Sequence, residues 1–286
     1  MTARLRLAIP NKGRLVEPTL RLLHDAGLVF DEHDRSLVSR VQNHALDILF
    51  VRTGDIIEFV GDGVADLGIT GLDLLAEAGA ELPRIRDLGY GRCRLAVAVP
   101  DDSDLRTIGD LAGHRVATSH PNTARRFFDR ERVPVDVVPI SGAVEVAPRL
   151  GLAEAIVDLV STGSTLGMNG LRPIGDVLAS EAVLISNPAA DRDRRAELDA
   201  IDTMFGAVIA ARDRKYLMMN APATHLAEIE RLLPALESPT VIPLAHDGMV
   251  AIHSVVGADE VWGLLPRLKS AGASGLLVLP IEKIIP

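Results

Sequence analysis

Two spacings of apolar residues alternate along the first third of the chain. Short apolar runs are typical of buried strands, whereas apolar residues three and four positions apart are typical of a helix with one face in a core. The predicted strands are Leu5–Ile9, Asp47–Val51 and Asp66–Ile69, and the predicted helices are Leu15–Ala26, Asp55–Val60 and Gly71–Glu77. This alternation predicts a mainly parallel sheet with helices on both faces.

A second unit with the same alternation begins at a predicted strand over Arg92–Val99. Its further strands are predicted at Arg115–Ser119, Val135–Ile140 and Glu154–Val160, and its helices at Asp104–Ala112, Pro121–Arg132 and Gly142–Leu150. The apolar run Ala182–Ser186 is predicted as a strand that returns to the first unit. Two α/β lobes joined by more than one crossing predict a hinged cleft, and open α/β sheets bind ligands at their strand ends.

The pattern changes after a charged stretch that begins at Asp191 and opens a helix to about Ala211. The strands predicted beyond it are Lys215–Asn220, Val241–Ala245, Val250–Val256 and Gly275–Pro280, and the helices are Thr224–Leu233 and Asp259–Ala271. The order β-α-β-β-α-β is that of a ferredoxin-like domain. We therefore predict three parts: residues 1–90 with 184–211, residues 91–183, and residues 212–286.

Composition narrows the classes of protein to consider. The length of 286 residues suits two or three domains, and 48% hydrophobic with 24% charged residues is typical of a soluble globular chain. The net charge of -9 argues against a nucleic-acid partner. The single cysteine, Cys93, excludes an intramolecular disulfide and a cysteine-cluster metal site. No signal peptide or apolar run of bilayer length is evident, so we expect a cytoplasmic protein with no membrane partner.

The stretch Glu154–Leu166 carries the most specific chemical pattern. An apolar strand with carboxylates at Glu154 and Asp158 runs into a loop that opens a helix. The loop consists of Ser161, Thr162, Gly163, Ser164, Thr165 and Leu166. Backbone N–H groups, hydroxyls and a helix N-terminus at one point form a cradle for phosphate, and the carboxylates suit ribose hydroxyls or Mg2+. The alternative is a helix cap with no ligand, which many α/β proteins contain.

Three cationic residues follow predicted strands at the ends where open α/β sheets bind ligands. Lys12 and Arg14 lie in the loop after the first strand, and Arg52 follows the next buried strand. Arginine offers a bidentate fork to phosphate and lysine a mobile point charge. The alternative for each is a solvated loop charge. His24 and His120 have no evident partner in the sequence, and no zinc-binding spacing is present.

A series of motifs extends along nearly the whole chain, and the motifs follow the order that they have in one protein family. They are Pro10–Leu15, Ala65–Gly71 followed by Asp73, Arg115–Ser119 with Pro121 and Asn122, the loop described above, and Leu236–Thr240. Together they resemble the ATP phosphoribosyltransferase family in its long form. The resemblance implies a two-lobed core of the periplasmic-binding-protein type II kind with the active site between the lobes, followed by a ferredoxin-like regulatory domain.

The resemblance implies the first reaction of histidine biosynthesis, in which the 5-phosphoribosyl group of phosphoribosyl pyrophosphate is transferred to N1 of ATP and pyrophosphate leaves. The 5-phosphate is then held by the loop 161–166, and the ribose hydroxyls by Glu154 and Asp158. Asp73 lies beside the purine, Glu145 lies in the cleft, and Lys12, Arg14 and Arg52 stabilise pyrophosphate charge. Mg2+ is held mainly by the substrate, with Glu154 and Asp158 as candidate protein ligands.

The same resemblance implies regulation and assembly. Histidine, the end product, is expected to bind as a feedback inhibitor at Asn220, Leu236, Ser238, Thr240 and Gly275. Asn220 stands where an acidic residue is expected, which predicts weaker inhibition because a neutral acceptor makes the weaker hydrogen bond. AMP is expected as a second inhibitor, and the chain as a homo-oligomer, a dimer or a hexamer.

A non-catalytic solute receptor is the competing hypothesis, because receptors share the two-lobed fold. An exported receptor needs a signal peptide, and a cytosolic sensor usually carries a DNA-binding helix pair. Neither is evident in the sequence, which favours the enzyme.

Overall fold

The structure is a computed structural model that describes residues 4–31, 37–161, 163–233 and 238–285. Two of the predicted site residues, Thr162 and Leu236, lie outside the described residues. The chain divides into two compact units, Met1–Asp199 and Ala200–Pro286, and each is considered by itself.

The first unit opens with a six-stranded sheet in the order β2-β3-β1-β4-β11-β5. Its strands are β1 (Leu5–Pro10), β2 (Val38–Arg40), β3 (Leu46–Val51), β4 (Leu67–Gly71), β5 (Arg84–Asp87) and β11 (Ala182–Ser186). Its helices are α1 (Val16–Asp25), α2 (Ile56–Gly61) and α3 (Leu72–Ala78). Strand β1 runs parallel to β3 and β4, so the carboxyl ends of these three strands meet at one edge. The outer pairings are antiparallel, so the predicted parallel sheet is parallel only at its centre.

Helix α2 packs closely on this sheet because β4 offers it a glycine. A Cβ atom at Gly68 would lie 2.7 Å from side-chain methyl groups of both Ile56 and Val60. Any larger residue would push the helix off the strand, which would open a cavity in a fully buried core.

A five-stranded sheet in the order β10-β6-β9-β7-β8 forms the second lobe of this unit. Its strands are β6 (Cys93–Pro100), β7 (Arg115–Thr118), β8 (Asp136–Pro139), β9 (Ala155–Val160) and β10 (Leu171–Ser180). Its helices are α4 (Pro121–Glu131), α5 (Ser164–Met168) and the short 3-10 turns η1 (Ile108–Leu111) and η2 (Val144–Val146). Strand β7 runs parallel to β8 and β9, so these three strands also share a carboxyl edge.

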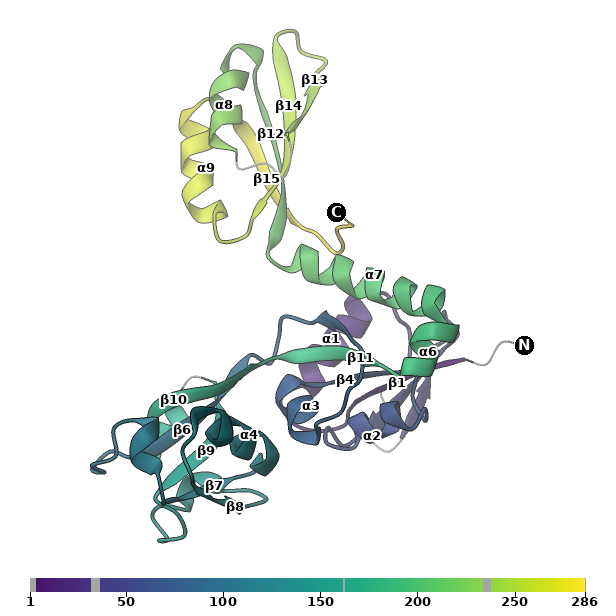
Figure 1. Ribbon diagram of the computed structural model, residues 1–286. Helices are drawn as coiled ribbons and strands as arrows, with labels where there is room; N and C mark the ends of the chain where they lie inside the picture. The colour runs from purple at the N-terminus through teal and green to yellow at the C-terminus, as the bar shows by residue number, and fades with distance from the viewer. Residues whose placement is uncertain (1–3, 32–36, 162, 234–237, 286) are drawn as a thin grey trace. The chain divides into compact units, whose positions relative to one another are not determined.

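The chain crosses between these two sheets twice, once from β5 to β6 and once from β10 to β11 (Figure 1). The crossing segments bind each other, because Leu88 N–H donates to the Ala182 carbonyl and Ala182 N–H donates to the Tyr90 carbonyl, both at 2.9 Å. The pairing of β11 with β4 and β5 confirms the predicted return to the first sheet. The result is the two-lobed α/β core that the sequence predicted.

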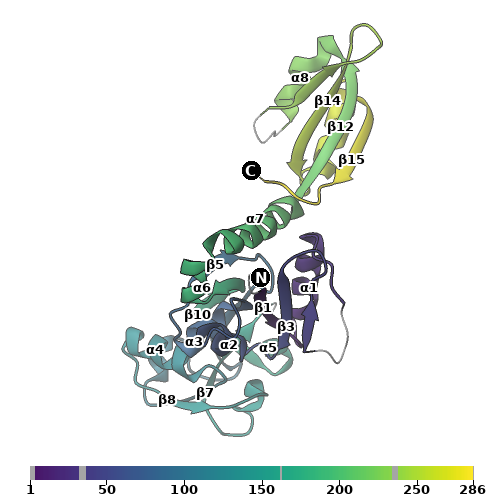
Figure 2. The ribbon, with the colours of Figure 1, turned by 90° about the vertical axis from the view of Figure 1, so that its right-hand side faces the viewer.

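Helices α6 (Pro188–Asp193) and α7 (Arg195–Arg212) lead into the second unit. This unit contains β12 (Arg214–Pro222), β13 (Thr240–Pro243), β14 (Met249–Gly257), β15 (Ser274–Pro280), the turn η3 (Ala223–His225), α8 (Leu226–Leu232) and α9 (Val261–Ser270). The sheet order β13-β14-β12-β15 is the ferredoxin-like order. Figure 1 shows α8 and α9 on one face of the sheet, and Figure 2 shows β14, β12 and β15 side by side.

Two predicted helices are wrong. The segment Asp104–Ala112 forms only η1: a capping box between Thr107 and Asp110 places the start of the turn at Ile108, and Ala112, with ψ of 122°, ends it after Leu111. The segment Gly142–Leu150 forms only η2. It begins after Ala143 in the left-handed region, and Pro148 has no N–H to donate to a helical bond.

Three strands were not predicted from the sequence, β2, β5 and β10. The first two are short and contain no apolar run: β2 has the buried Ser39 between two exposed residues, and β5 has only exposed or half-buried residues. Strand β10 shifts register at Pro173/Gly175 and again at Asp176/Leu178. These irregularities hide the alternation that identifies a strand in a sequence.

Candidate active site

The predicted cationic residues lie in the loops that follow β1 and β3, at the edge where the carboxyl ends of these parallel strands meet. Pro10 of β1 lies beside Val51 of β3, and the next residue of the chain, Asn11, donates its N–H to the Val51 carbonyl at 2.8 Å. The loops with Lys12 and Arg14 on one side and Arg52 on the other therefore start next to each other. All three side chains are exposed. Ligands of open α/β sheets bind just outside the carboxyl ends of the strands, where these loops lie.

The predicted phosphate loop joins β9 to α5 in the second sheet. Gly163 holds a left-handed backbone with φ of 82°, which turns the chain into the helix at little cost for a residue without Cβ. Ser161, Ser164 and Thr165 are exposed at the start of the helix, where a ligand could reach them. The Leu166 side chain is 4% exposed within the core beside Val160, so any contact of Leu166 with a substrate would be made by its backbone.

Arg14 joins the two loops. Its Nη1 donates to Ser161 Oγ at 3.2 Å, and its Nη2 donates to Cys93 Sγ at 2.9 Å. Cys93 was predicted as a small strand residue, and it is the first residue of β6. Since Ser161 and Cys93 both belong to the second sheet, the cationic loop of one lobe faces the phosphate loop of the other.

Asp158 lies in β9 on the same face of the strand as Val160. Burial raises the pKa of Asp158 above its ordinary value, and the nearby Glu145 carboxylate raises it further, although the Leu159 N–H bound at 2.8 Å and His120 oppose the shift. Glu145 is half-buried on η2. A buried carboxylate beside a second one is suited to bind hydroxyl groups or a cation.

Glu154 lies away from the loop, so its predicted place beside the ribose is wrong. It precedes β9, whereas Ser161 follows it, and a strand of 6 residues separates them. At about 3.3 Å per residue this distance is roughly 20 Å. The Glu154 carboxylate instead accepts the backbone N–H of Arg115 at 2.8 Å and so fixes the start of the strand pair.

Asp73 is buried at the boundary between the two sheets and is not a plain helix-terminal carboxylate. Its Oδ1 accepts the Ser180 hydroxyl at 2.6 Å, and its Oδ2 lies 3.3 Å from His120 Nε2. Burial raises the pKa of Asp73, but the bonds from His120 and Ser180 together lower it below its ordinary value. Asp73 therefore stays ionised, and His120 has the partner that the sequence did not reveal.

Two family models match the chain. The one described as ATP phosphoribosyltransferase matches residues 52–207, and the one described as HisG, C-terminal domain, matches residues 211–283. The chain belongs to the ATP phosphoribosyltransferase family. The second match identifies the long form, with its regulatory domain, and the chain is therefore an enzyme.

Individual relatives agree with this family. An ATP phosphoribosyltransferase from Gemmatimonas aurantiaca is 48% identical over 99% of this chain and 100% of the relative. One from Methanosarcina barkeri is 42% identical over 99% of this chain and 100% of the relative. A solved chain from the ATP phosphoribosyl transferase (HisG:HisZ) complex of Thermotoga maritima is 29% identical with a TM-score of 0.62, over 70% of this chain and 96% of that one.

The regulatory domain of this ATP phosphoribosyltransferase-family chain has a cavity of about 550 Å³ on its sheet. Ser238 and Thr240, two of the predicted histidine ligands, line it together with Tyr216 and His253. The hydroxyl of Tyr216 lies 3.0 Å from His253 Nδ1. The cavity thus offers hydroxyls, an imidazole and an aromatic ring, which suit a small polar ligand.

Asn220 and Gly275 lie together, but they are not among the residues that line this cavity. Asn220 is exposed on β12, and its carbonyl accepts the Ser274 hydroxyl at 3.3 Å. A Cβ atom at Gly275 would be 3.5 Å from Asn220 Nδ2. Within the described part of the regulatory domain, the predicted ligand set therefore falls into two pairs.

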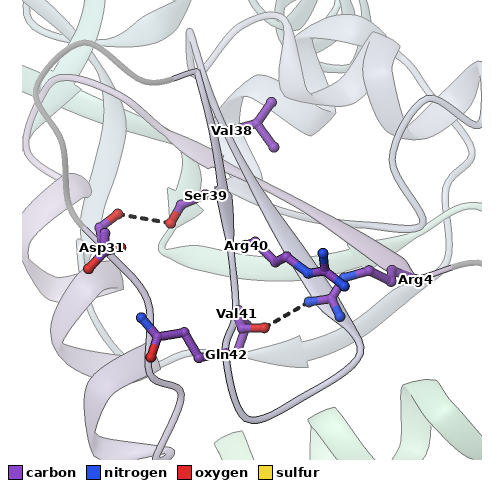
Figure 3. Close-up of a pocket in the computed structure, with 7 residues that line it drawn as sticks. All are labelled: Arg4, Asp31, Val38, Ser39, Arg40, Val41 and Gln42. Carbon is purple, nitrogen blue, oxygen red and sulfur yellow. Dashed lines mark hydrogen bonds between the residues drawn. The ribbon is translucent and has the colours of Figure 1, made fainter.

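A second cavity of about 450 Å³, at the edge strand β2, is shown in Figure 3. Arg4 lies in its wall and donates Nη2 to the carbonyls of Val41, His44 and Leu46, while its Nε binds Asp47 at 2.7 Å. The Arg4 guanidinium thus binds the segment of chain between β2 and β3. Because Arg4 precedes β1 and the cationic loop follows β1, this cavity lies at the opposite edge of the sheet from the active site.

Among the described residues, none of the helices is both long and apolar enough to cross a membrane. Among them there is also no group of three or more His, Cys, Asp or Glu side chains placed to hold a metal ion.

Two contacts in the site were missed by sequence reasoning. Ser180 ends β10, a strand that was not predicted, so its hydroxyl had no assigned place beside Asp73. Cys93 was recognised as a strand residue, but its contact with Arg14 joins positions 79 residues apart. No local pattern in a single sequence signals a contact of that kind.

Proposed function

We propose that this enzyme transfers the 5-phosphoribosyl group from phosphoribosyl pyrophosphate to N1 of ATP, releasing pyrophosphate, as the first step of histidine biosynthesis. The observation that carries the proposal is the contact of Arg14 with Ser161 at 3.2 Å. It brings a loop rich in positive charge against a loop of hydroxyls and helical N–H groups. A substrate with a phosphate at one end and a pyrophosphate at the other matches this pair of loops.

The 5-phosphate is assigned to the β9–α5 loop, where Ser161, Ser164, Thr165 and the N–H groups after Gly163 supply donors. Thr162 belongs to the same proposal, although it lies outside the described residues. Asp158 accepts the ribose hydroxyls from the adjoining strand. Burial raises its pKa, and hydroxyl donors that replace its lost hydration would stabilise the charged form and lower the pKa again.

Lys12, Arg14 and Arg52 would bind the pyrophosphate and stabilise the charge that grows on it as the C1 bond breaks. The sugar carbon becomes oxocarbenium-like, and N1 of the purine then attacks it. Catalysis by this route depends on aligning the two substrates and on fixed charge, and it needs no nucleophilic side chain. This accounts for an active site built from loop cations and hydroxyls.

The purine is assigned to the boundary between the lobes, beside Asp73, and Glu145 is assigned to the same cleft. Each Asp73 oxygen already accepts one hydrogen bond. A carboxylate oxygen has a second lone pair, so Asp73 retains the capacity to accept from the exocyclic amino group of an adenine. AMP carries the same base and would bind as an inhibitor in the same place.

Mg2+ fits this site as an ion that takes most of its ligands from substrate phosphates and water. Such an ion needs only one or two protein carboxylates. Asp158 and Glu145 fit, because the pKa of Asp158 is raised partly by Glu145 and a cation would relieve that repulsion. Glu154 does not fit, since it lies at the other end of β9. Bound there, Mg2+ would neutralise pyrophosphate charge.

Histidine is proposed as the feedback inhibitor of this enzyme, bound in the regulatory domain by Ser238, Thr240, Asn220 and Gly275 together with Leu236. The cavity beside Ser238 and Thr240 supports this assignment. Asn220 and Gly275 do not line that cavity. We propose that the chain forms a homo-oligomer, a dimer or a hexamer, in which a second subunit completes the histidine site.

The proposed reaction is tested by an absorbance assay for the purine adduct with ATP, phosphoribosyl pyrophosphate and Mg2+ supplied together. The signal should require both substrates and should rise with stoichiometric release of pyrophosphate. Binding of both substrates with no adduct would favour a receptor and overturn the assignment of the reaction.

A further inference from the structure

Helix α3 of the first sheet carries two carboxylates that both reach α4 of the second sheet. Asp73 and Glu77 are four residues apart and so lie on the same face of the helix. Asp73 contacts His120, which is the N-cap residue of α4. Glu77 contacts the first turn of α4 directly, and it has no part in the proposed chemistry.

The Glu77 carboxylate accepts one backbone N–H with each oxygen. Oε1 takes the N–H of Asn122 at 2.9 Å, and Oε2 takes the N–H of Thr123 at 2.8 Å. The Asn122 amide donates back to the Glu77 carbonyl at 3.2 Å. Arg126, one turn further along α4, donates to the carbonyl of Ala76. The end of one helix is thus fixed to the start of another across the boundary between the two sheets.

The first turn of a helix leaves backbone N–H groups without helical partners and has a partial positive charge. Helix α4 has 11 residues, enough for a full dipole, and its first turn contains Pro121 and no acidic residue of its own. Such a terminus would attract a phosphate. Glu77 fills it from the other lobe, so the protein's own carboxylate takes the place that a substrate phosphate could occupy.

This contact also sets the position of active-site groups. His120 precedes the helix turn that Glu77 holds, and it follows Thr118 of β7, whose partner in β9 is Val157. Asp158 is the next residue of that strand. A shift of α4 relative to α3 would therefore change the distance between Asp73, on the purine side, and Asp158, on the ribose side.

We propose that Glu77 is a positioning residue: by binding the first turn of α4 it fixes the separation of the two lobes at which purine and phosphoribosyl group are aligned. The role rests on the proposed function of the cleft. It acts through backbone N–H groups and requires no contact of Glu77 with either substrate.

The test compares Glu77→Ala and Glu77→Gln with Asp110→Ala in the full-length chain. Asp110 is a matched control, because its Oδ2 also accepts two backbone N–H groups, from Arg106 at 2.9 Å and Thr107 at 2.8 Å, but within one lobe. Adduct formation is measured for both substrates, with thermal unfolding recorded in parallel. Acetate, with chloride at equal ionic strength as its control, is added to replace the lost carboxylate.

Glu77→Ala should lower kcat by tenfold or more with a smaller change in KM, because misalignment weakens the transition state more than ground-state binding. Glu77→Gln, which keeps an acceptor but loses the charge, should fall between it and the wild type. Acetate should restore part of the Glu77→Ala rate, and Asp110→Ala should stay within twofold of the wild type.

Equal kinetics for Glu77→Ala and the wild type would overturn the proposal, as would equal losses in the Glu77 and Asp110 variants with no response to acetate. Should Glu77→Ala fail to fold, Glu77→Gln alone decides the question by its kcat. A wild type that binds both substrates without forming adduct would instead contradict the proposed function, and with it this role.

Discussion

Arg14 and Ser161 are 147 residues apart in the chain, and a hydrogen bond of 3.2 Å joins Arg14 Nη1 to Ser161 Oγ. The arginine belongs to the loop after the first strand of one sheet, and the serine to the loop after the central β9 of the other. In the proposed function, their contact marks the place where a substrate with phosphates at both ends would bind. It also shows which arginine of the chain faces the phosphate loop.

Replacing Arg14 with lysine should lower kcat/KM for phosphoribosyl pyrophosphate by about tenfold, although the charge is kept. Lysine has no bidentate fork, and each lost charge-assisted hydrogen bond is worth roughly 1.5–3 kcal/mol. Arg21→Lys on α1 is the control, because Arg21 only pairs with Glu17 at the surface. Steady-state kinetics of adduct formation compare the two. If both variants match the wild type, Arg14 is a solvated loop residue.

Replacing Thr165 with valine removes a hydroxyl from the phosphate loop while keeping the shape of the side chain. The apparent affinity for phosphoribosyl pyrophosphate should fall about tenfold, and further when Thr162→Val is added, because each hydroxyl donates to a charged group. Titration calorimetry measures the change. Thr203→Val, on the exposed side of α7, should bind normally. Unchanged affinity in the folded double variant would remove the loop from the binding site.

Replacing Asp158 with asparagine should stabilise the free protein at neutral pH while lowering activity. The pKa of Asp158 is raised in the folded state, so the unfolded chain binds fewer protons between the ordinary and the raised value. The contribution of Asp158 to the stability of the wild type therefore falls as pH rises through that window and stays lower above it. Asparagine has no charge to bury, so its advantage in unfolding temperature should appear at neutral pH and vanish in acid.

Thermal unfolding of the two proteins at several pH values, without ligands, measures this effect, and the adduct assay measures the loss of activity. A gain in stability that persists unchanged in acid would contradict the electrostatic cause. Full activity of Asp158→Asn would contradict its role at the ribose and at Mg2+.

Replacing Asn220 with aspartate should tighten histidine binding severalfold. A carboxylate accepts a charge-assisted hydrogen bond from an ammonium or imidazolium group, roughly twice as strong as the neutral bond that asparagine accepts. Calorimetry with histidine and inhibition of adduct formation measure the change. Thr224→Asp adds the same charge at an exposed turn of the same domain and should have no effect. Absence of histidine binding to the wild type up to millimolar concentration would contradict the allosteric assignment.

Local pattern was enough for most of the elements. Strand β1 and helix α1 lie within a residue of their predicted ends, since continuous apolar runs and helical spacing are properties of adjacent residues. The β-α-β-β-α-β order of the regulatory domain was predicted for the same reason. The predictions that failed concern segments whose conformation depends on particular side-chain bonds or on strand pairing. The capping box of Thr107 and Asp110 moved the start of a predicted helix to Ile108 and left only a 3-10 turn, and bulges concealed β10.

The residues of the candidate site also fall into two groups, those that the sequence located correctly and those that it did not. The loop after β9 and the cations after β1 and β3 were identified from residue type and position at strand ends, and the structure shows which of them meet. Glu154 and Leu166 were assigned by membership of the motif alone. The length of β9 separates Glu154 from the loop, and the direction of the Leu166 side chain places it in the core.

The sequence by itself determined the order of elements, the class of each domain and the chemical types of group available for the reaction, because these depend on residues close together in the chain. Only the tertiary structure decided that Arg14 meets Ser161, that His120 pairs with Asp73, and that Glu77 binds the start of α4. Each of these contacts joins residues from different lobes. The chain crosses between the lobes twice, and the relative placement of two packed sheets is set by the whole set of contacts between them.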